Sequence, residues 1–276
     1  MKFTKMHGLG NDYVYIDCFH EVVDNPQRLA VKMSDRHFGV GSDGLVLIEP
    51  SEVADAKMRM FNADGSEAEM CGNAIRCVGK YFYENHQRKT TLKIETLAGI
   101  KELSLKVADN QVIAVTVNMG APILENAAIP VAVTGEQLIN YPIEVNNHCY
   151  QFTAVSMGNP HCVIFVPEIT DAMVLGDGPL LEKHPLFPKR TNVEFVKLND
   201  DASLTMRVWE RGSGETLACG TGACAVTVAA ILNNYIQDSA TIHLQGGDLE
   251  ISWQQPGQPV YMTGSATTVF SGYWYL

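Results

Sequence analysis

A constant spacing of 148 residues links short motifs along this chain and constrains its fold more than any other feature of the sequence. Gly10-Asn11 recurs as Gly158-Asn159, and Cys71-Gly72 recurs as Cys219-Gly220 at the same spacing. Any one of these matches could arise by chance. Because the spacing does not change along the chain, the matches indicate an internal duplication.

Each half repeats the same order of expected elements. A Gly-Asn turn leads into an apolar strand, an alternating strand follows at 57–61 or 204–209, and a polar loop then leads through Cys-Gly into a helix. We expect the helices over about 73–84 and 221–233. The second helix is apolar nearly all round, so strands of its own half must surround it.

This organisation predicts an α+β fold of two pseudo-symmetric domains. Each domain is expected to be a mostly antiparallel sheet or barrel wrapped around a central helix, with the active site in the cleft between the domains. The stretch Gly120-Ala121-Pro122 is the natural boundary. We therefore expect residues 1–118 plus 264–276 to form the first domain and 119–263 the second.

The composition excludes several classes of partner. The formal net charge is −11 and 18% of the 276 residues are charged, without a Lys/Arg cluster of the kind that binds nucleic acid or a membrane surface. The first residues lack the apolar core of an export signal, and the sequence contains no apolar run long enough for a membrane helix. We therefore expect a cytoplasmic protein.

The two duplicated cysteines, Cys71 and Cys219, stand where a loop turns into a helix. The first turn of a helix has unsatisfied N–H groups and a partial positive charge, which should favour the thiolate and lower the pKa of the thiol. The same N–H groups can hold a substrate carboxylate, and the glycine after each cysteine leaves room for it.

The duplication also predicts the geometry of the chemistry. Two halves related by an approximate two-fold axis would place Cys71 and Cys219 on opposite faces of one bound carbon. One thiolate could then remove an α-proton while the opposite thiol returns a proton to the other face, which inverts the carbon. Two helix N-termini would stabilise the charge that spreads into the carboxylate, so the reaction would need no imine-forming cofactor.

Other interpretations of the seven cysteines fit less well. The spacings Cys71-x5-Cys77 and Cys219-x4-Cys224 are not the Cys-x-x-Cys pairs typical of a zinc site, so we predict no metal. A disulfide between the two duplicated cysteines would be a liability when the site is empty, and a single nucleophilic cysteine would not explain its duplicate. We expect the remaining cysteines to be mostly buried, structural thiols, namely Cys18, Cys77, Cys149, Cys162 and Cys224.

Five motifs in fixed order resemble those of the diaminopimelate epimerase family. The resemblance covers the whole chain, up to the closing Tyr261-Met262-Thr263-Gly264-Ser265-Ala266. The motifs are Met6-His7-Gly8-Leu9-Gly10-Asn11-Asp12, Phe61-Asn62-Ala63-Asp64-Gly65-Ser66, Cys71-Gly72-Asn73, Met157-Gly158-Asn159-Pro160-His161 and Glu210-Arg211-Gly212-x-Gly214-Glu215-Thr216-x-x-Cys219-Gly220.

The resemblance implies conversion of LL-2,6-diaminopimelate into the meso isomer, without a cofactor, for lysine and peptidoglycan synthesis. It implies that Cys71 and Cys219 are the acid and base, and that His161 and Glu210 tune the pKa values of the thiols. Arg211 can grip a carboxylate with two parallel hydrogen bonds. The residues that the resemblance assigns to substrate binding are Asn11, Asn62, Gly72, Asn73, Asn159, Asn192, Glu210, Arg211, Gly220 and Thr221.

Two positions depart from the family pattern. Gly44 stands where some members have glutamine, and Ala74 stands where many have a second glycine. The resemblance further implies a homodimer, and the apolar run Gly272–Leu276 could lie against a partner or against its own domain. A diamino-acid-binding protein without catalysis and an isomerase for another amino acid remain alternatives, which a comparison of diaminopimelate with proline would separate.

Overall fold

The computed structural model describes residues 1–133, 135, 137–254 and 257–275. The chain divides into two units, the first formed by Met1–Asn118 with Thr263–Leu276 and the second by Met119–Met262. Thr263 was expected in the second domain but groups with the first unit, where its Oγ1 lies 2.7 Å from the Oγ1 of Thr116. Of the expected C-terminal run, Leu276 lies outside the described residues.

The first unit is a mixed sheet with two helices. Strands pair in the order β18-β1-β2-β3-β4-β6-β7-β8, where β2 with β3 and β4 with β6 are parallel and the other pairs are antiparallel. Its elements are β1 (Lys2–Gly8), β2 (Asn11–Asp17), α1 (Pro26–Ser34), β3 (Gly44–Glu49), β4 (Ala56–Asn62), β5 (Glu67–Ala68), α2 (Gly72–Asn85), β6 (Thr91–Thr96), β7 (Gly99–Ala108), β8 (Gln111–Asn118) and β18 (Thr267–Tyr273), while β17 (Tyr261–Gly264) spans the change of unit and pairs with β8.

The second unit repeats this plan. Strands pair in the order β9-β10-β11-β12-β13-β15-β16, and again two pairs, β11 with β12 and β13 with β15, are parallel. Its elements are β9 (Tyr141–Val145), β10 (His148–Ser156), β11 (Pro160–Phe165), a π-helical turn η1 (Ala172–Asp177), α3 (Gly178–Glu182), β12 (Asn192–Leu198), β13 (Leu204–Glu210), β14 (Gly214–Glu215), α4 (Gly220–Leu232), β15 (Ser239–Leu244) and β16 (Gly247–Ser252).

The strand register confirms the duplication. Tyr13 pairs with Gly44 in the first unit, and the residues 148 positions later, His161 and Asn192, pair in the second. The same correspondence holds for the parallel pairs β4–β6 and β13–β15. The predicted α+β fold of two similar halves is therefore correct, although each half contains two parallel strand pairs within its mostly antiparallel sheet.

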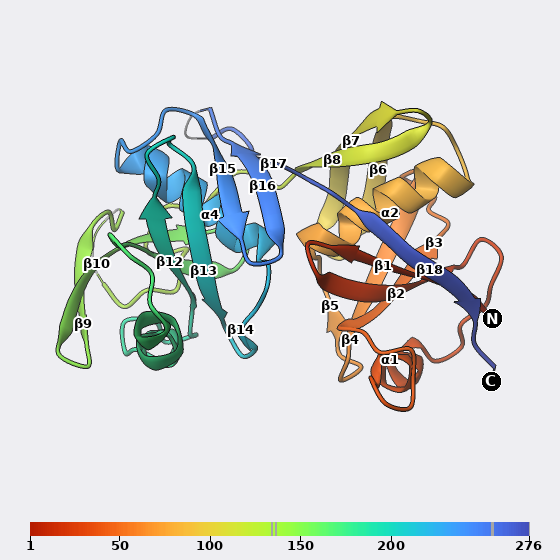
Figure 1. Cartoon of the computed structure of the whole chain (residues 1–276), viewed down its shortest axis with the longest axis horizontal. Coiled ribbons are helices and arrows are strands. Elements are labelled where there is room, and N and C mark those ends of the chain that lie inside the picture. Colours follow the sequence, from red (N-terminus) through yellow and green to blue (C-terminus); the bar gives the residue numbers. More distant parts are fainter. Residues whose placement is uncertain (134, 136, 255–256, 276) are drawn as a thin grey trace. The chain divides into compact units, whose positions relative to one another are not determined.

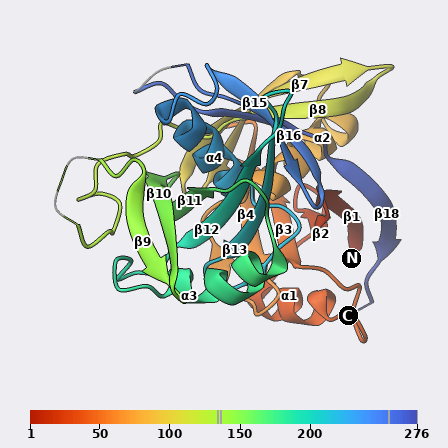
Figure 2. The same cartoon turned by 60° about the vertical axis from the view of Figure 1, so that its left-hand side comes forward.

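Each unit contains one central helix that begins at the duplicated Cys-Gly. In the first unit α2 contacts β1, β2, β4, β6, β7 and β8, as can be followed in Figure 1. In the second unit α4 contacts β10, β11, β12, β15 and β16, and Figure 2 shows it among these strands. Every residue of α4 from Gly222 to Ala230 is buried, which explains why that stretch is apolar on all sides.

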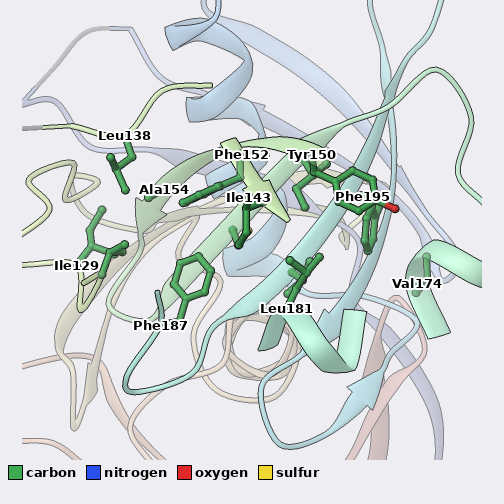
Figure 3. Close-up of a cluster of buried hydrophobic side chains, with 14 residues drawn as sticks. Ile129, Leu138, Ile143, Tyr150, Phe152, Ala154, Val174, Leu181, Phe187 and Phe195 are labelled. Carbon is green, nitrogen blue, oxygen red and sulfur yellow. The ribbon is translucent and has the colours of Figure 1, made fainter. Parts of the chain in front are cut away.

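The second unit also has an apolar cluster between its sheet and α3. Phe152, Phe187 and Phe195 are each at most 2% exposed, and Figure 3 shows their rings with Leu181 beside them. The rings of Phe152 and Phe187 meet edge to face with centroids 5.4 Å apart. This cluster fixes β12, the strand that carries Asn192 and Glu194.

The burial of the other cysteines differs in part from expectation. Cys77, Cys162 and Cys224 are buried, but Cys18 is half-buried and Cys149 is exposed. Cys149 is the second residue of β10, next to the hairpin turn, where its side chain leaves the sheet for solvent. None of the helices in the described part of the chain combines the length and apolarity that a membrane crossing needs.

Candidate active site

The first thiol, Cys71, is the N-cap residue of α2. Its backbone is extended (φ −140°, ψ 124°), and the helical hydrogen bonds begin with the N–H of Ile75 donating to the carbonyl of Cys71. The amides of Gly72 and Asn73 therefore precede the helical ladder and form its electropositive start. The Cys71 Sγ lies 3.5 Å from Asn11 Oδ1, to which Asn73 Nδ2 also donates at 3.4 Å.

Asn11 is held in this orientation by a charged network. Its Nδ2 donates to Asp43 at 2.8 Å, and Arg36 donates to the other oxygen of Asp43 at 2.9 Å. Asp12, the next residue of β2, forms ion pairs with Lys5 and Arg36. Burial alone would raise the pKa of Asp12, but these two cations lower it below its ordinary value.

Arg76 supports the start of α2 and was missed by the sequence analysis. Its side chain is fully buried, and its guanidinium donates to the Gly72 carbonyl at 3.1 Å and to Asn73 Oδ1 at 2.9 Å. A third bond reaches the carbonyl of Ser265 at 3.0 Å. An arginine within the otherwise apolar stretch Ala74–Gly79 was the available signal, because a buried guanidinium needs fixed acceptors.

Two further predicted positions of the first half have clear geometries. Asn62 ends β4, and its Nδ2 donates to Ser66 Oγ at 3.0 Å. At Gly44, a Cβ would fall on the carbonyl oxygen of Phe61 and lie 2.8 Å from Tyr13 Cε1. No side chain fits at Gly44 in this backbone, so only main-chain atoms are available for a contact at this position.

The second thiol, Cys219, is the N-cap residue of α4 and is 5% exposed. Its Sγ accepts a hydrogen bond from the Gly222 amide at 3.4 Å and lies 3.5 Å from Thr221 Oγ1. These two contacts favour the thiolate, as the sequence predicted. Burial outweighs them, however, and together with the charges of Glu210 and Glu194 it raises the pKa of Cys219 well above its ordinary value. The expected lowering of the pKa of this thiol is therefore wrong for the structure described.

His161 is fully buried and connects to this thiol through other side chains. Its Nδ1 lies 2.6 Å from Glu194 Oε1, and its Nε2 lies 3.1 Å from Asn159 Oδ1. Asn159 Nδ2 in turn donates to Thr221 Oγ1 at 3.3 Å. A continuous hydrogen-bond chain thus runs from Glu194 to Cys219, and Glu194 is a second functional candidate that the sequence analysis missed.

The remaining predicted residues of the second half surround β13 and its turn. Asn192 is 3% exposed, donates to the Pro160 carbonyl at 2.9 Å and accepts the Arg211 amide at 2.9 Å. Arg211 itself is exposed, with Nη1 3.3 Å from the Lys189 carbonyl, and Glu210 accepts a hydrogen bond from Thr216 at 2.5 Å. The helical ladder of α4 begins with the N–H of Ala223, so the amides of Gly220 and Thr221 precede it.

One group in the described residues has the composition of a metal site. Atoms of Asp17, His20 and His86 lie within 4.8 Å of one another. Asp17 ends β2 and His86 follows α2, whereas Asn11 and Cys71 lie at the opposite ends of the same two elements. The helix alone separates this group from Cys71 by roughly 20 Å, so the group is not part of the first thiol's surroundings.

Comparison with known sequences gives a consistent family. The family model described as diaminopimelate epimerase matches residues 3–125 and 153–269. A diaminopimelate epimerase of Acetivibrio thermocellus is 58% identical over 273 residues, covering 99% of this chain and 98% of that protein. One from Methanococcus maripaludis is 57% identical and covers 99% of both chains.

Solved structures of lower identity share the fold. A phenazine biosynthesis protein of the PhzF family from Bacillus anthracis matches with a TM-score of 0.72 at 17% identity, over 100% of this chain and 99% of that one. A hydroxyproline epimerase from Agrobacterium vitis matches with a TM-score of 0.70 at 16% identity, over 99% of this chain and 90% of that one.

Proposed function

Because the chain belongs to the diaminopimelate epimerase family, we propose that it inverts one α-carbon of LL-2,6-diaminopimelate by moving protons between the thiols of Cys71 and Cys219. The product is meso-diaminopimelate, a precursor for lysine and for peptidoglycan. The observation that supports this mechanism best is the placement of the two cysteines, which occupy the same N-cap position of α2 and α4 in two duplicated units.

The proton transfers balance without an added reactant. A thiolate takes the α-proton, so that the C–H bond breaks and an S–H bond forms, and the electron pair spreads into the carboxylate. The opposite thiol then gives its proton to the other face of the carbon and becomes a thiolate. The mechanism therefore requires the two sulfurs to reach opposite faces of one α-carbon.

The substrate carboxylate is held by the helix starts. The amides of Gly72 and Asn73 in one unit, and of Gly220 and Thr221 in the other, offer N–H donors and the positive ends of the helices. These dipoles are fixed before the reaction, so they stabilise the charge as it develops on the carboxylate. The buried guanidinium of Arg76 binds the Gly72 carbonyl and adds positive charge to the first of these sites.

The distal amino-carboxylate end of the substrate needs its own contacts. Arg211 is exposed and provides a fork of N–H donors for the distal carboxylate, while Asn192 fixes the backbone amide of that arginine. Asn62 and the carboxylate of Glu210 provide acceptors for the distal ammonium. Burial raises the pKa of Cys219 and the charge of Glu210 raises it further, which supports the tuning role that the motif assigns to Glu210.

We also propose that the protein forms a homodimer and is located in the cytoplasm. On β18 the apolar side chains of Val269, Phe270 and Tyr273 are 54%, 47% and 67% exposed, and we assign this strand to a homodimer contact. The mechanism needs reduced thiols, and none of the seven cysteines, all of which are described, is part of a disulfide. Reduced thiols persist in the cytoplasm, where we place the protein.

The test uses purified protein with LL-diaminopimelate, and with proline as a comparison substrate. Meso-diaminopimelate should form from the first substrate, and proline should not be racemised. Cys71→Ala and Cys219→Ala should each lose most of the epimerisation while they keep the thermal stability of the parent. Full epimerase activity in either variant would reject the two-thiol mechanism.

A further inference from the structure

Glu194 is a buried carboxylate on β12, between Val193 and Phe195, which are both 0% exposed. The side chain is 0% exposed, and the residue 148 positions earlier is Val46, which is also 0% exposed. The residue 148 positions before its partner His161 is Tyr13, which is also buried. At these duplicated positions the unit that carries Cys219 therefore has a buried carboxylate and imidazole where the other unit has valine and tyrosine, and burying such a pair has a desolvation cost.

Geometry fixes how many protons this pair holds. Both ring nitrogens of His161 face oxygen acceptors, Glu194 Oε1 at 2.6 Å and Asn159 Oδ1 at 3.1 Å. In the orientation described, Asn159 presents its Oδ1 to the imidazole while its Nδ2 donates to Thr221 Oγ1. One proton must therefore lie between Glu194 and Nδ1 and another between Nε2 and Asn159. Whichever atom carries the first proton, the pair is electrically neutral.

Glu194 also lies close to the sulfur itself. A Cβ placed on Gly222 would be 2.9 Å from Glu194 Oε1 and 3.2 Å from Cys219 Sγ, so both atoms border the same position beside the helix start. The other oxygen, Oε2, is buried and has no hydrogen-bond partner among the described residues.

We propose that Glu194 is a positioning residue for Cys219, which holds His161 and gives it a proton whenever Cys219 becomes a thiolate. The inference rests on the proposed function, because it takes Cys219 as one of the two acid–base thiols. In this step the O–H bond of Glu194 breaks and an N–H bond forms at His161 Nδ1. The imidazolium then donates a stronger hydrogen bond to Asn159, and this bond is passed to the new thiolate through Asn159 and Thr221, while no proton leaves the cluster.

The surroundings of Glu194 disfavour its ionised form. Burial raises its pKa, while His161 acts in the opposite direction. The titratable groups that face it are His161 and Cys162 on β11, Glu210 on β13 and Cys219 on α4. Of these, only His161 can become a cation, so it is the group that can compensate a thiolate in this buried cluster.

Glu194→Gln tests the proposal, because glutamine keeps the volume and a hydrogen bond but has no proton to transfer. We expect kcat to fall about 10- to 100-fold in both reaction directions with KM little changed, since each direction passes through a Cys219 thiolate. Iodoacetamide modification of Cys219, followed by peptide mass spectrometry across pH, should slow about tenfold, the equivalent of one pKa unit. Cys71 in the same protein should react as before.

Asp177→Asn is the matched control. Asp177 is 2% exposed in the same unit and bonds His148 at 2.7 Å and Tyr150 at 2.6 Å, so the substitution also removes a buried carboxylate from a histidine. It should lower stability without changing kcat or the reactivity of Cys219. Faster modification of Cys219 in Glu194→Gln would show that Glu194 only repels the thiolate, and a loss of stability alone would show a structural role. Either result overturns the proposal.

A double-mutant cycle tests whether Glu194 acts through His161. The double variant Glu194→Gln/His161→Gln should be no slower than His161→Gln alone, and additive losses would contradict the proposal. If Glu194→Gln does not fold, the double variant His161→Tyr/Glu194→Val takes its place. It introduces the residues found at the corresponding positions of the first unit, Tyr13 and Val46, and it should slow Cys219 modification to the same extent. These modification rates need no epimerase activity, so failure of this inference is distinguishable from failure of the proposed function.

Discussion

Gly222→Ala adds one methyl group at the point where the second thiol, the buried carboxylate and the core meet. The new Cβ would lie 2.9 Å from Glu194 Oε1, 3.1 Å from Met206 Cε and 3.2 Å from Cys219 Sγ. The Met206 methyl is the end of a flexible side chain and can move. Glu194 is tied to His161, and the sulfur is tied to the Gly222 amide, so both are displaced by a few tenths of an ångström.

The size of the effect follows from these displacements. A misplacement of about 1 Å in a reacting group costs about 100-fold in rate, so a few tenths should cost roughly tenfold in kcat, or about 1.4 kcal/mol of barrier. Overpacking destabilises by about 1–3 kcal/mol, and replacing a helical glycine by alanine returns about 1 kcal/mol. The net loss of unfolding free energy should therefore be small, about 0–2 kcal/mol.

The assay compares initial rates of epimerisation in both directions with urea unfolding of the same preparations. Gly79→Ala is the control, because it also adds a methyl to a central helix, 2.8 Å from Leu103 Cδ2, in a core region without a thiol. That variant should lose stability and keep kcat. The reasoning is refuted if Gly222→Ala keeps the parental kcat, or if both variants lose activity in proportion to stability.

Three further outcomes follow from the structure. Gly44→Gln should destabilise the first unit by about 3 kcal/mol or more in urea unfolding, since any Cβ there meets the carbonyl of Phe61, and a neutral result would contradict that geometry. Ala74→Gly, at the position that corresponds to Gly222, should cost about 1 kcal/mol of unfolding free energy without a matching loss of kcat, and a large loss of kcat would show that Ala74 shapes the site. Because the pKa of Asp12 is lower in the folded state, the ionised carboxylate stabilises the fold at pH values above its ordinary pKa of 3.8. This contribution to the unfolding free energy is lost as the pH falls through the pKa of the folded state. Asp12→Asn should therefore flatten the acid limb of a plot of unfolding free energy against pH, and an unchanged limb would show that other carboxylates govern it.

The sequence predicted the repeated parts of this molecule well. The spacing of 148 residues reappears in the strand register, in the two parallel pairs of each unit and in the N-cap positions of Cys71 and Cys219. The N-cap positions follow from local pattern, because turns and helix starts are encoded over a few residues, whereas the parallel pairing of strands was not predicted. The family assignment made from the motifs is also confirmed.

The features that the sequence did not predict depend on contacts between distant residues. His161 and Glu194 are 33 positions apart and meet because β11 and β12 pair in parallel. Arg76 finds one of its acceptors at Ser265, 189 positions away. The pKa of Cys219 is raised because burial outweighs the helix amides, and the burial of one thiol cannot be read from its helix start alone.

The most direct test of the two-thiol mechanism is the fate of the substrate α-hydrogen in deuterium oxide. With LL-diaminopimelate at low conversion, every meso product molecule should carry one deuterium at the inverted carbon while the recovered substrate stays unlabelled. This follows because one thiol removes the hydrogen and a different thiol, already exchanged with solvent, supplies the deuterium. Meso product that retains the original hydrogen would show that a single group both removes and returns the proton, and it would contradict the two-thiol mechanism.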